Sequence, residues 1–293
     1  MKLGAKLPHS GALAMRRAPA EMAAELEAAG FDSIWVSDHI VFPVETSSRY
    51  PFSADGKVTW SFEDPYLEPM VVLAAVTATT KRAALGTSVS IAPMRNPVLL
   101  AKQAASIDAM SGGRLVLGVG AGWLREEFEA LDADFENRGA VLDEWIEIAR
   151  ACWSGLAGPH HGKHYSIPVA IHCLPKPEGA MPVLIGGMSR HALRRAGAVA
   201  DGWLGQFALD TLSESEIGGA VDTIRREAEN AGRQGADTRV VIRITGAATK
   251  PDAVATRLRT LGEAGATEVI VDVDWNEDGG PARAHDALSA GLN

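Results

Sequence analysis

The chain has 293 residues, 46% of them hydrophobic and 22% charged, and its 28 Lys and Arg stand against 37 Asp and Glu for a net charge of −9. This composition is typical of a globular protein and excludes a disordered or collagen-like chain, and no apolar run reaches the roughly 18 residues of a membrane-spanning helix. Because the first residues also lack the pattern of a signal peptide, we expect a cytoplasmic protein. The acidic balance offers no basic patch for nucleic acid or an anionic bilayer, so we expect the partner to be a small molecule.

Short β-branched runs alternate along the chain with longer stretches of helical periodicity, a pattern that predicts a parallel sheet covered by helices. The predicted strands are residues 2–7, 33–37, 84–91, 114–119, 182–185, 202–204, 239–245 and 268–273. The predicted helices are residues 19–29, 69–79, 97–111, 138–154, 189–200, 211–232, 251–264 and 281–291. Eight strand–helix units favour an α/β fold of the (β/α)8 TIM-barrel type over an open doubly wound sheet. We expect a single domain over residues 1–293.

Two stretches depart from this alternation. Residues 39–64 form a polar and aromatic insertion after the second strand, and residues 155–180 form an insertion rich in Gly, Pro and His before the fifth. Loops of this length are usually lids or binding loops. Tyr50, Trp60 and Phe62 of the first insertion could wall a planar ligand, or could equally pack the loop onto the barrel.

In a barrel of this type the chemistry lies at the carboxyl ends of the strands. Asp38 and His39 directly follow the second strand, where a carboxylate beside an imidazole could fix the tautomer of the ring and present it to a ligand. The alternative is a loop cap beside a histidine at the rim. Thr87 and Ser88 place hydroxyl groups in a buried strand end, where they could bind either a ligand or the neighbouring strand.

Two glycine-rich turns are candidate ligand sites. Gly120 and Gly122 follow the fourth strand and allow a ligand close to the backbone, although the spacing lacks the dinucleotide-binding pattern. The second turn is the stronger candidate because its glycines precede the N-cap of a helix, where free N–H groups bind phosphate. It comprises Gly186, Gly187, Met188, Ser189 and Arg190.

Other motifs argue against particular chemistries. The tract from His160 to His164 lacks helical spacing and a nearby carboxylate in the sequence, so we expect no metal site. No serine stands in a G-x-S-x-G context, which disfavours a serine hydrolase. Cys152 and Cys173 are expected to be reduced thiols.

Several stretches together resemble the luciferase-like monooxygenase superfamily, and within it the oxidoreductases that use the deazaflavin coenzyme F420. They are AAGFDSIWVSDH at 28–39, LGTSV at 85–89, the segment 97–108, SGGRLVLGVGAGW at 111–123 with Glu126 and Glu127 after it, PVLIGG at 182–187 and ADGW at 200–203. The resemblance extends from the first strand to about residue 206, and the last third carries few marks of the family.

The resemblance implies a barrel with the coenzyme across its carboxyl end. Asp38 and His39 would line the deazaflavin ring, and Ser88-Val89 falls where the family has a non-prolyl cis peptide and a β-bulge behind the ring. Gly186 and Gly187 would take the phosphate of the coenzyme tail. The implied chemistry is hydride transfer to or from a small hydrophobic substrate, and a homodimer is expected by the same resemblance.

One departure from the family concerns the acid–base residue. The sugar-phosphate dehydrogenases of the family carry a glutamate just after the glycine-rich turn, where this sequence has Trp123. This argues against glucose-6-phosphate as the substrate, leaves His39 as the candidate catalytic residue, and makes Trp123 a candidate wall of the substrate and coenzyme sites. Two alternatives stay open: an FMN-dependent monooxygenase with a separate reductase, and a flavin-binding protein without catalysis.

Overall fold

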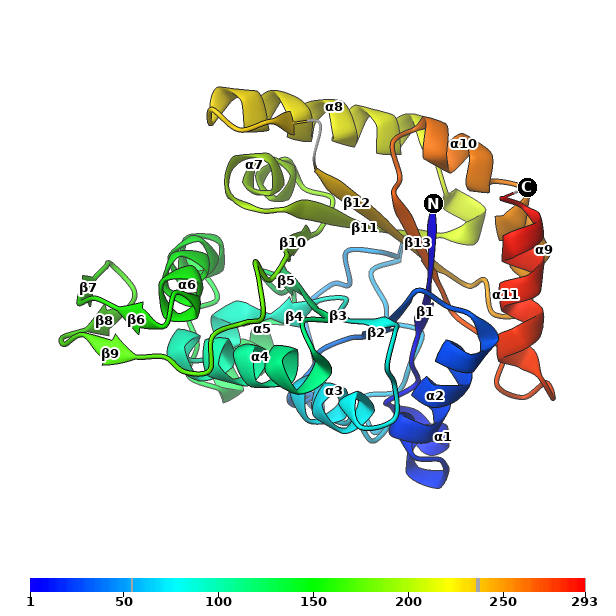
Figure 1. Ribbon diagram of the computed structural model, residues 1–293, viewed down its shortest axis with the longest axis horizontal. Helices are drawn as coiled ribbons and strands as arrows, with labels where there is room; N and C mark the ends of the chain where they lie inside the picture. The colour runs from blue at the N-terminus through cyan, green and yellow to red at the C-terminus, as the bar shows by residue number, and fades with distance from the viewer. Residues whose placement is uncertain (54, 236–237, 293) are drawn as a thin grey trace.

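Eight parallel strands form a closed barrel at the centre of the molecule (Figure 1). The computed structural model describes residues 1–53, 55–235 and 238–292. The barrel strands are β1 (Lys2–Lys6), β2 (Ser33–Val36), β3 (Ala84–Thr87), β5 (Leu115–Gly120), β10 (Val183–Gly186), β11 (Gly202–Ala208), β12 (Arg239–Thr245) and β13 (Glu268–Val271). The parallel pairing of β10 with β5, in which Val183 lies opposite Leu117, closes the ring. The predicted TIM barrel is therefore confirmed.

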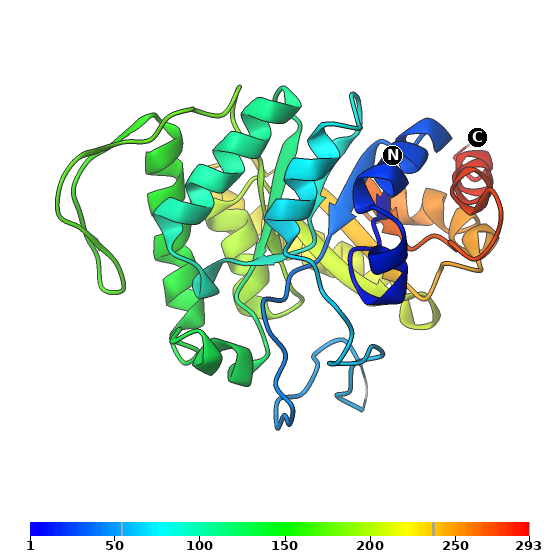
Figure 2. The ribbon, with the colours of Figure 1, turned by 90° about the horizontal axis from the view of Figure 1, so that it is seen from below.

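Helices cover the outside of the barrel (Figures 1 and 2). The helices that follow the predicted pattern are α2 (Pro19–Ala29), α3 (Pro69–Thr77), α4 (Pro97–Ser111), α6 (Arg138–Trp153), α7 (Arg190–Val199), α8 (Glu214–Asn230) and α11 (Gly280–Ala290). The sequence did not predict the short helices α1 (Gly11–Arg16), η1 (Ala92–Met94), α5 (Arg125–Ala130) and η2 (Leu209–Thr211). No helix in the described ranges is both long enough and apolar enough to cross a membrane.

The helix ends follow local chemistry. Proline occupies the first turn of α2, α3 and α4, where a missing N–H costs nothing. The Asn96 side chain caps α4 by accepting hydrogen bonds from the N–H groups of Val98 (3.0 Å) and Leu99 (3.2 Å). Gly30 and Gly112 end α2 and α4 with φ angles of 110° and 71°, in the left-handed region that glycine adopts readily.

One predicted helix is wrong. Residues 251–264 form two short helices, α9 (Pro251–Ala255) and α10 (Leu258–Glu263), instead of one. Between them Arg257 has a φ angle of −103°, and its guanidinium bonds the carbonyl of Leu212 at 2.7 Å and the carboxylate of Glu214. The helix is thus interrupted where Arg257 contacts a distant segment. Such contacts cannot be recognised from the hydrophobic periodicity of residues 251–264.

The third predicted strand is also interrupted. In place of a continuous strand over 84–91, β3 ends at Thr87, the peptide bond between Ser88 and Val89 is cis, and β4 (Ser90–Ile91) pairs instead with the end of β5. The cis bond lies at the position that the family resemblance implies.

The amino end of the barrel interior is held by a buried glutamate. The Glu268 carboxylate accepts hydrogen bonds from Ser33 Oγ (2.5 Å) and Trp35 Nε1 (3.0 Å) and forms an ion pair with Arg239. These groups come from three strands, β13, β2 and β12. The indole of Trp35 fits because Gly86 has no Cβ, which would lie 2.3 Å from its ring. The network ties the strands at the end opposite the strand termini that carry candidate site residues.

The two insertions lie on different parts of the molecule. The first, after β2, hangs below the barrel in Figure 2 and covers the carboxyl ends of the strands. The second contains two antiparallel ribbons, β6 (Leu156–Ala157) with β9 (Ile171–His172) and β7 (His160–His161) with β8 (Ser166–Ile167). It projects away from the barrel (Figure 1). The described part of the first insertion is therefore placed to shape a site at the strand ends.

Candidate functional site

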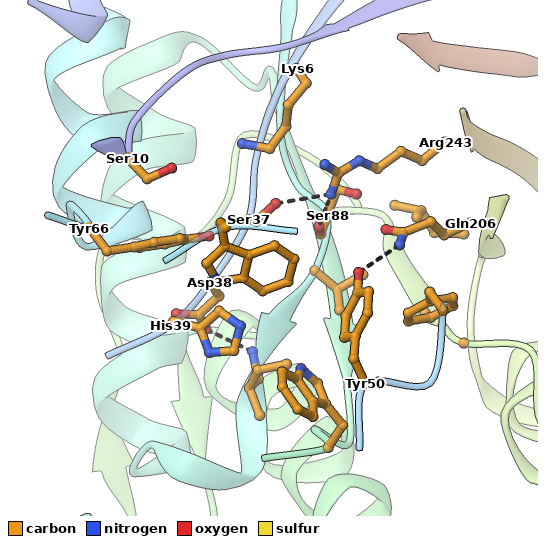
Figure 3. Close-up of a pocket in the computed structure, with 18 residues that line it drawn as sticks. Lys6, Ser10, Ser37, Asp38, His39, Tyr50, Tyr66, Ser88, Gln206 and Arg243 are labelled. Carbon is orange, nitrogen blue, oxygen red and sulfur yellow. Dashed lines mark hydrogen bonds between the residues drawn. The ribbon is translucent and has the colours of Figure 1, made fainter. Parts of the chain in front are cut away.

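A cavity of about 220 Å³ opens at the carboxyl ends of the strands (Figure 3). Its polar lining comes from Lys6 on β1, Ser37 after β2, Ser88 after β3, Gln206 on β11 and Arg243 on β12. The first insertion supplies an aromatic wall on the other side. That wall consists of Tyr50, Phe52 and Trp60, and Tyr66, just after the insertion, adds a fourth ring to the lining.

A second, larger cavity of about 980 Å³ adjoins the first. Six residues line both: Phe52, Val89, Ile91, Trp123, Gly186 and Gly187. From this shared wall the larger cavity extends between α6 and α7 to Arg138, Ser189 and Arg195. The two cavities together can hold two ligands, or one ligand with a long tail.

His39 is buried beside the smaller cavity and is held by a carboxylate from α5. Its Nδ1 lies 2.8 Å from Oε2 of Glu127, a side chain with 2% exposure. A carboxylate only accepts, so Nδ1 carries a hydrogen, and whenever the ring is neutral its lone pair lies on Nε2. Within the described residues Nε2 has no hydrogen-bond partner, so it is available to a ligand.

Glu127 and its neighbour Glu126 also fasten the first insertion. Glu127 Oε1 accepts from the N–H groups of Ile40 (2.6 Å) and Val41 (3.3 Å). Glu126 accepts from the N–H and Oγ of Ser47, at 2.7 and 3.1 Å, and from those of Ser48, at 3.3 and 2.7 Å. Partial burial alone would raise the pKa of Glu126, but these hydrogen bonds outweigh it and lower the pKa to about 2.

The Asp38 carboxylate is fully used by protein groups. It accepts from Ser90 Oγ (3.1 Å), from the Ile91 N–H (2.7 Å) and from two nitrogens of Arg95, at 2.5 and 2.8 Å. Arg95 also bonds Glu68 at 3.0 Å. Asp38 lines the smaller cavity, yet its oxygens hold β4 against β2 and so fix the chain on both sides of the cis bond.

Val89 is wedged between two of the predicted glycines. A Cβ at Gly186 would lie 2.6 Å from Val89 Cγ1, and one at Gly120 would lie 2.7 Å from Val89 Cγ2. A Cβ at Gly122 would instead meet the ring of Phe128 at 2.6 Å. These glycines therefore admit protein side chains, and Val89 reaches the wall that the two cavities share.

The amino terminus of α7 faces the larger cavity. Ser189 caps the helix by accepting from the Ala192 N–H at 3.2 Å, and the preceding Gly187 has a φ angle of 117°. The first N–H groups of a helix have no partner within it, and the helix dipole favours an anion there. Arg195 lines the cavity one turn further along, although Asp143 and the Gly139 carbonyl already bond it.

The remaining predicted residues are placed as follows. Trp123 lines both cavities and packs edge-on against His39, with ring centroids 6.0 Å apart. Met188 lines the larger cavity, whereas Arg190 is exposed and lines neither. Thr87 donates to the Gly118 carbonyl at 2.7 Å. Phe62 stacks on Phe42 outside both linings.

The histidine tract is packed by a carboxylate that the local sequence does not show. Glu144 of α6 bonds His160 Nε2 (2.9 Å) and the N–H groups of His164 (2.9 Å) and Tyr165 (2.8 Å). These contacts hold the projecting ribbons to α6. Across the described ranges, no group of three or more His, Cys, Asp or Glu side chains is arranged to hold a metal.

Sequence reasoning missed four residues of the site. Glu127 was noted without a role, and Arg95, Lys6 and Arg243 were not singled out. The only local signal was a cation in a strand: Lys6 closes β1, and Arg243 stands between Ile242 and Ile244. A charge in a buried strand needs a partner inside the barrel, which could have marked both residues.

Comparison with curated proteins gives relatives over most of the chain. An uncharacterized protein of Mycobacterium tuberculosis is 36% identical over 250 residues, which cover 85% of this chain and 83% of that protein. An F420-dependent glucose-6-phosphate dehydrogenase of Nocardia farcinica is 32% identical over 190 residues. That match covers 63% of this chain and 51% of the enzyme.

Solved structures share the fold. An F420-dependent secondary alcohol dehydrogenase aligns over 100% of this chain and 99% of its own, with a TM-score of 0.79 and 17% identity. The oxygenating constituent of a Pseudomonas putida diketocamphane monooxygenase, in complex with FMN, covers 100% and 98% with a TM-score of 0.73 and 18% identity. The sequence model described as luciferase-like monooxygenase matches residues 4–288, from β1 into α11. The chain therefore belongs to the luciferase-like monooxygenase family.

Proposed function

We propose that this protein is a coenzyme F420-dependent oxidoreductase that transfers a hydride between the deazaflavin and a small substrate. The observation that carries the proposal is the buried pair of His39 and Glu127 beside two adjoining cavities. The resemblance to F420-dependent dehydrogenases among the curated relatives supports the choice of coenzyme.

The larger cavity fits a coenzyme with a ring and an anionic tail. In this proposal Val89 and Trp123 lie against the ring, on the wall shared with the smaller cavity, and Gly120 and Gly122 lie further along the larger cavity. The tail phosphate would take the helix terminus. Gly187, Met188 and Ser189 form the approach to it.

The protein's own contribution is positioning and proton control. A bound deazaflavin supplies the hydride acceptor or donor, at its C5 atom. His39 Nε2 takes up or returns the proton that leaves or joins the substrate, and Glu127 holds the ring in the tautomer that can accept it. The Trp123 and Tyr50 rings, 5.2 Å apart, exclude water from the place where the two ligands meet.

The test is a fluorescence titration of the purified protein with F420 and, separately, with FMN. We expect F420 to bind more tightly, and His39→Asn to keep this binding while losing turnover. Glu126→Gln is the matched control, because Glu126 fastens the same insertion without touching His39. Binding of neither coenzyme would refute the proposal.

The alternatives give distinct results in the same experiment. Preference for FMN, as in the FMN complex of the diketocamphane enzyme, would make the protein a monooxygenase that needs a separate reductase. Tight F420 binding without turnover of any substrate would indicate a coenzyme-binding protein. The homodimer expected from the resemblance is tested separately by sedimentation.

A further inference from the structure

We propose that the smaller cavity binds a substrate carrying a carboxylate, held between Lys6 and Arg243. The inference rests on the proposed function, because it gives the larger cavity to the coenzyme and the smaller one to the substrate. Figure 3 shows the two cations reaching the same end of the cavity from different strands, with His39 away from that end.

Arg243 has unused capacity to bind an anion. Its Nη1 donates to Ser37 Oγ at 3.0 Å and lies 3.4 Å from the Ser88 carbonyl, while its Nε is buried without a partner. The nearest carboxylate, Asp272, is 3.8 Å from Nη2, beyond hydrogen-bond distance. Arg95 in the same end of the barrel shows the contrast, since two carboxylates saturate it.

Among the described residues, Lys6 has no carboxylate within ion-pair distance. Its ammonium group donates to two uncharged acceptors, the Leu7 carbonyl at 3.0 Å and His9 Nδ1 at 3.1 Å. Burial, and then the charge of Arg243, hold the pKa of Lys6 well below its usual value, while Asp272 acts in the opposite direction. An anion bound between the two cations would offset both unfavourable effects.

The described residues bring little negative charge to Lys6 and Arg243. Asp38 and Glu68 pair with Arg95, and Glu127 bonds His39, so these three carboxylates are engaged elsewhere. Among the described residues, Asp272, whose side chain is 31% exposed, is the one carboxylate within 4 Å of Arg243. Buried charges in proteins are paired, so the weak pairing of Arg243 points to a ligand that brings a negative charge and that favours the charged form of Lys6.

Neutral donors complete the subsite. Gln206 Nε2 donates to the Tyr50 hydroxyl oxygen at 2.9 Å, which leaves the Tyr50 hydrogen free to be donated. Burial raises the pKa of Tyr50, so the hydroxyl keeps that hydrogen. Ser88 Oγ is buried and has no partner among the described residues. A carboxylate has two oxygens with several acceptor sites, which suits this set of donors.

The rest of the cavity fits an apolar body. Phe52, Trp60 and Trp123 supply apolar rings to its lining. A carboxylate anchored at Lys6 and Arg243 would place the attached carbon skeleton along these rings and toward His39. The inferred substrate class is therefore a small organic acid with an apolar, preferably planar, body.

The test uses benzoate and its uncharged analogue benzamide, titrated into coenzyme-free protein and followed by the fluorescence of Trp60 and Trp123. Benzoate should bind at least about tenfold more tightly than benzamide, because charge-assisted hydrogen bonds distinguish the two. Arg243→Gln and Lys6→Met should each lower the affinity for benzoate at least about tenfold and leave the affinity for benzamide unchanged. Arg226→Gln, the same change on the exposed face of α8, should alter neither.

Each other result has a defined meaning. Equal affinity for the two probes, or no binding of either, overturns the carboxylate subsite whatever the coenzyme titration shows. Selective benzoate binding without F420 binding supports the subsite and refutes the proposed function instead. If the variants lose affinity for F420 but bind benzoate as before, Lys6 and Arg243 bind the coenzyme and the proposal is wrong. Should Arg243→Gln fail to fold, Lys6→Met carries the same comparison.

Discussion

Replacing Glu127 by glutamine tests the most consequential contact of the site. The carboxylate accepts three hydrogen bonds, from His39 Nδ1 at 2.8 Å and from the N–H groups of Ile40 and Val41 at 2.6 and 3.3 Å. A glutamine side chain has the same shape but only one oxygen. That oxygen can accept either from His39 Nδ1 or from the N–H groups of Ile40 and Val41, but not from both. If its oxygen stays with Ile40, its NH2 group faces Nδ1, which must then accept, so the hydrogen of the neutral ring moves to Nε2.

The expected loss of stability follows from these bonds. A hydrogen bond to a charged group contributes about 1.5–3 kcal/mol and a neutral one about 1 kcal/mol. Replacing the three charged bonds by neutral ones, at about 0.5–2 kcal/mol each, should therefore cost about 1.5–6 kcal/mol. Urea unfolding measures this cost, and nitrogen NMR of the His39 ring reports the tautomer. Glu126→Gln is the matched control, because its bonds to Ser47 and Ser48 lie near the surface. Equal stability of the two variants, with the Nδ1 hydrogen retained in both, would refute the reasoning.

Three further predictions concern other parts of the barrel. Gly186→Ala should cost about 1–3 kcal/mol by overpacking against Val89, and much less when combined with Val89→Ala, since that removes the clashing methyl group; additive effects in urea unfolding would contradict the wedge. His9 has its pKa lowered by burial and by Lys6 from 6.5 to about 2, so the unfolded chain binds the extra proton and stability falls as the pH drops below 6.5. His9→Gln should lower the slope of the unfolding free energy against pH by up to about 1.4 kcal/mol per pH unit. The same slope between pH 6.5 and 4.5 in the variant and in the unchanged protein would argue against this role of His9. Glu268→Gln should cost about 3 kcal/mol by leaving Arg239 without its charge partner, which thermal unfolding would detect, and an unchanged midpoint would count against the network.

The fold was predictable because its signals are local. Most barrel strands are short apolar runs, and helix starts such as Pro97 after Asn96 are set by neighbouring residues. The errors have distant causes. Residues 84–91 form one continuous run by composition, yet Asp38 holds β4 in place and the chain breaks at Ser88-Val89.

The candidate site was predictable in its location but not in its pairings. Asp38 and His39 were found from their position at a strand end. Their partners are Arg95, 57 residues further along the chain, and Glu127, 88 residues further. Such pairs form only when the barrel closes. The glycine turns were found for their lack of a side chain, but the structure shows that at Gly186 and Gly120 this room is taken by Val89.

The buried Glu268 network has a consequence for how this protein could change over time. It fastens three strands at the amino end of the barrel, whereas the two cavities are lined by residues from the opposite end and from the first insertion. Substitutions at Tyr50, Gln206 or Arg243 therefore leave this fastening untouched. Because the stabilising network and the cavities lie at opposite ends of the barrel, the cavity residues are a suitable target for randomised libraries. New substrate preferences can then be selected while barrel closure is retained.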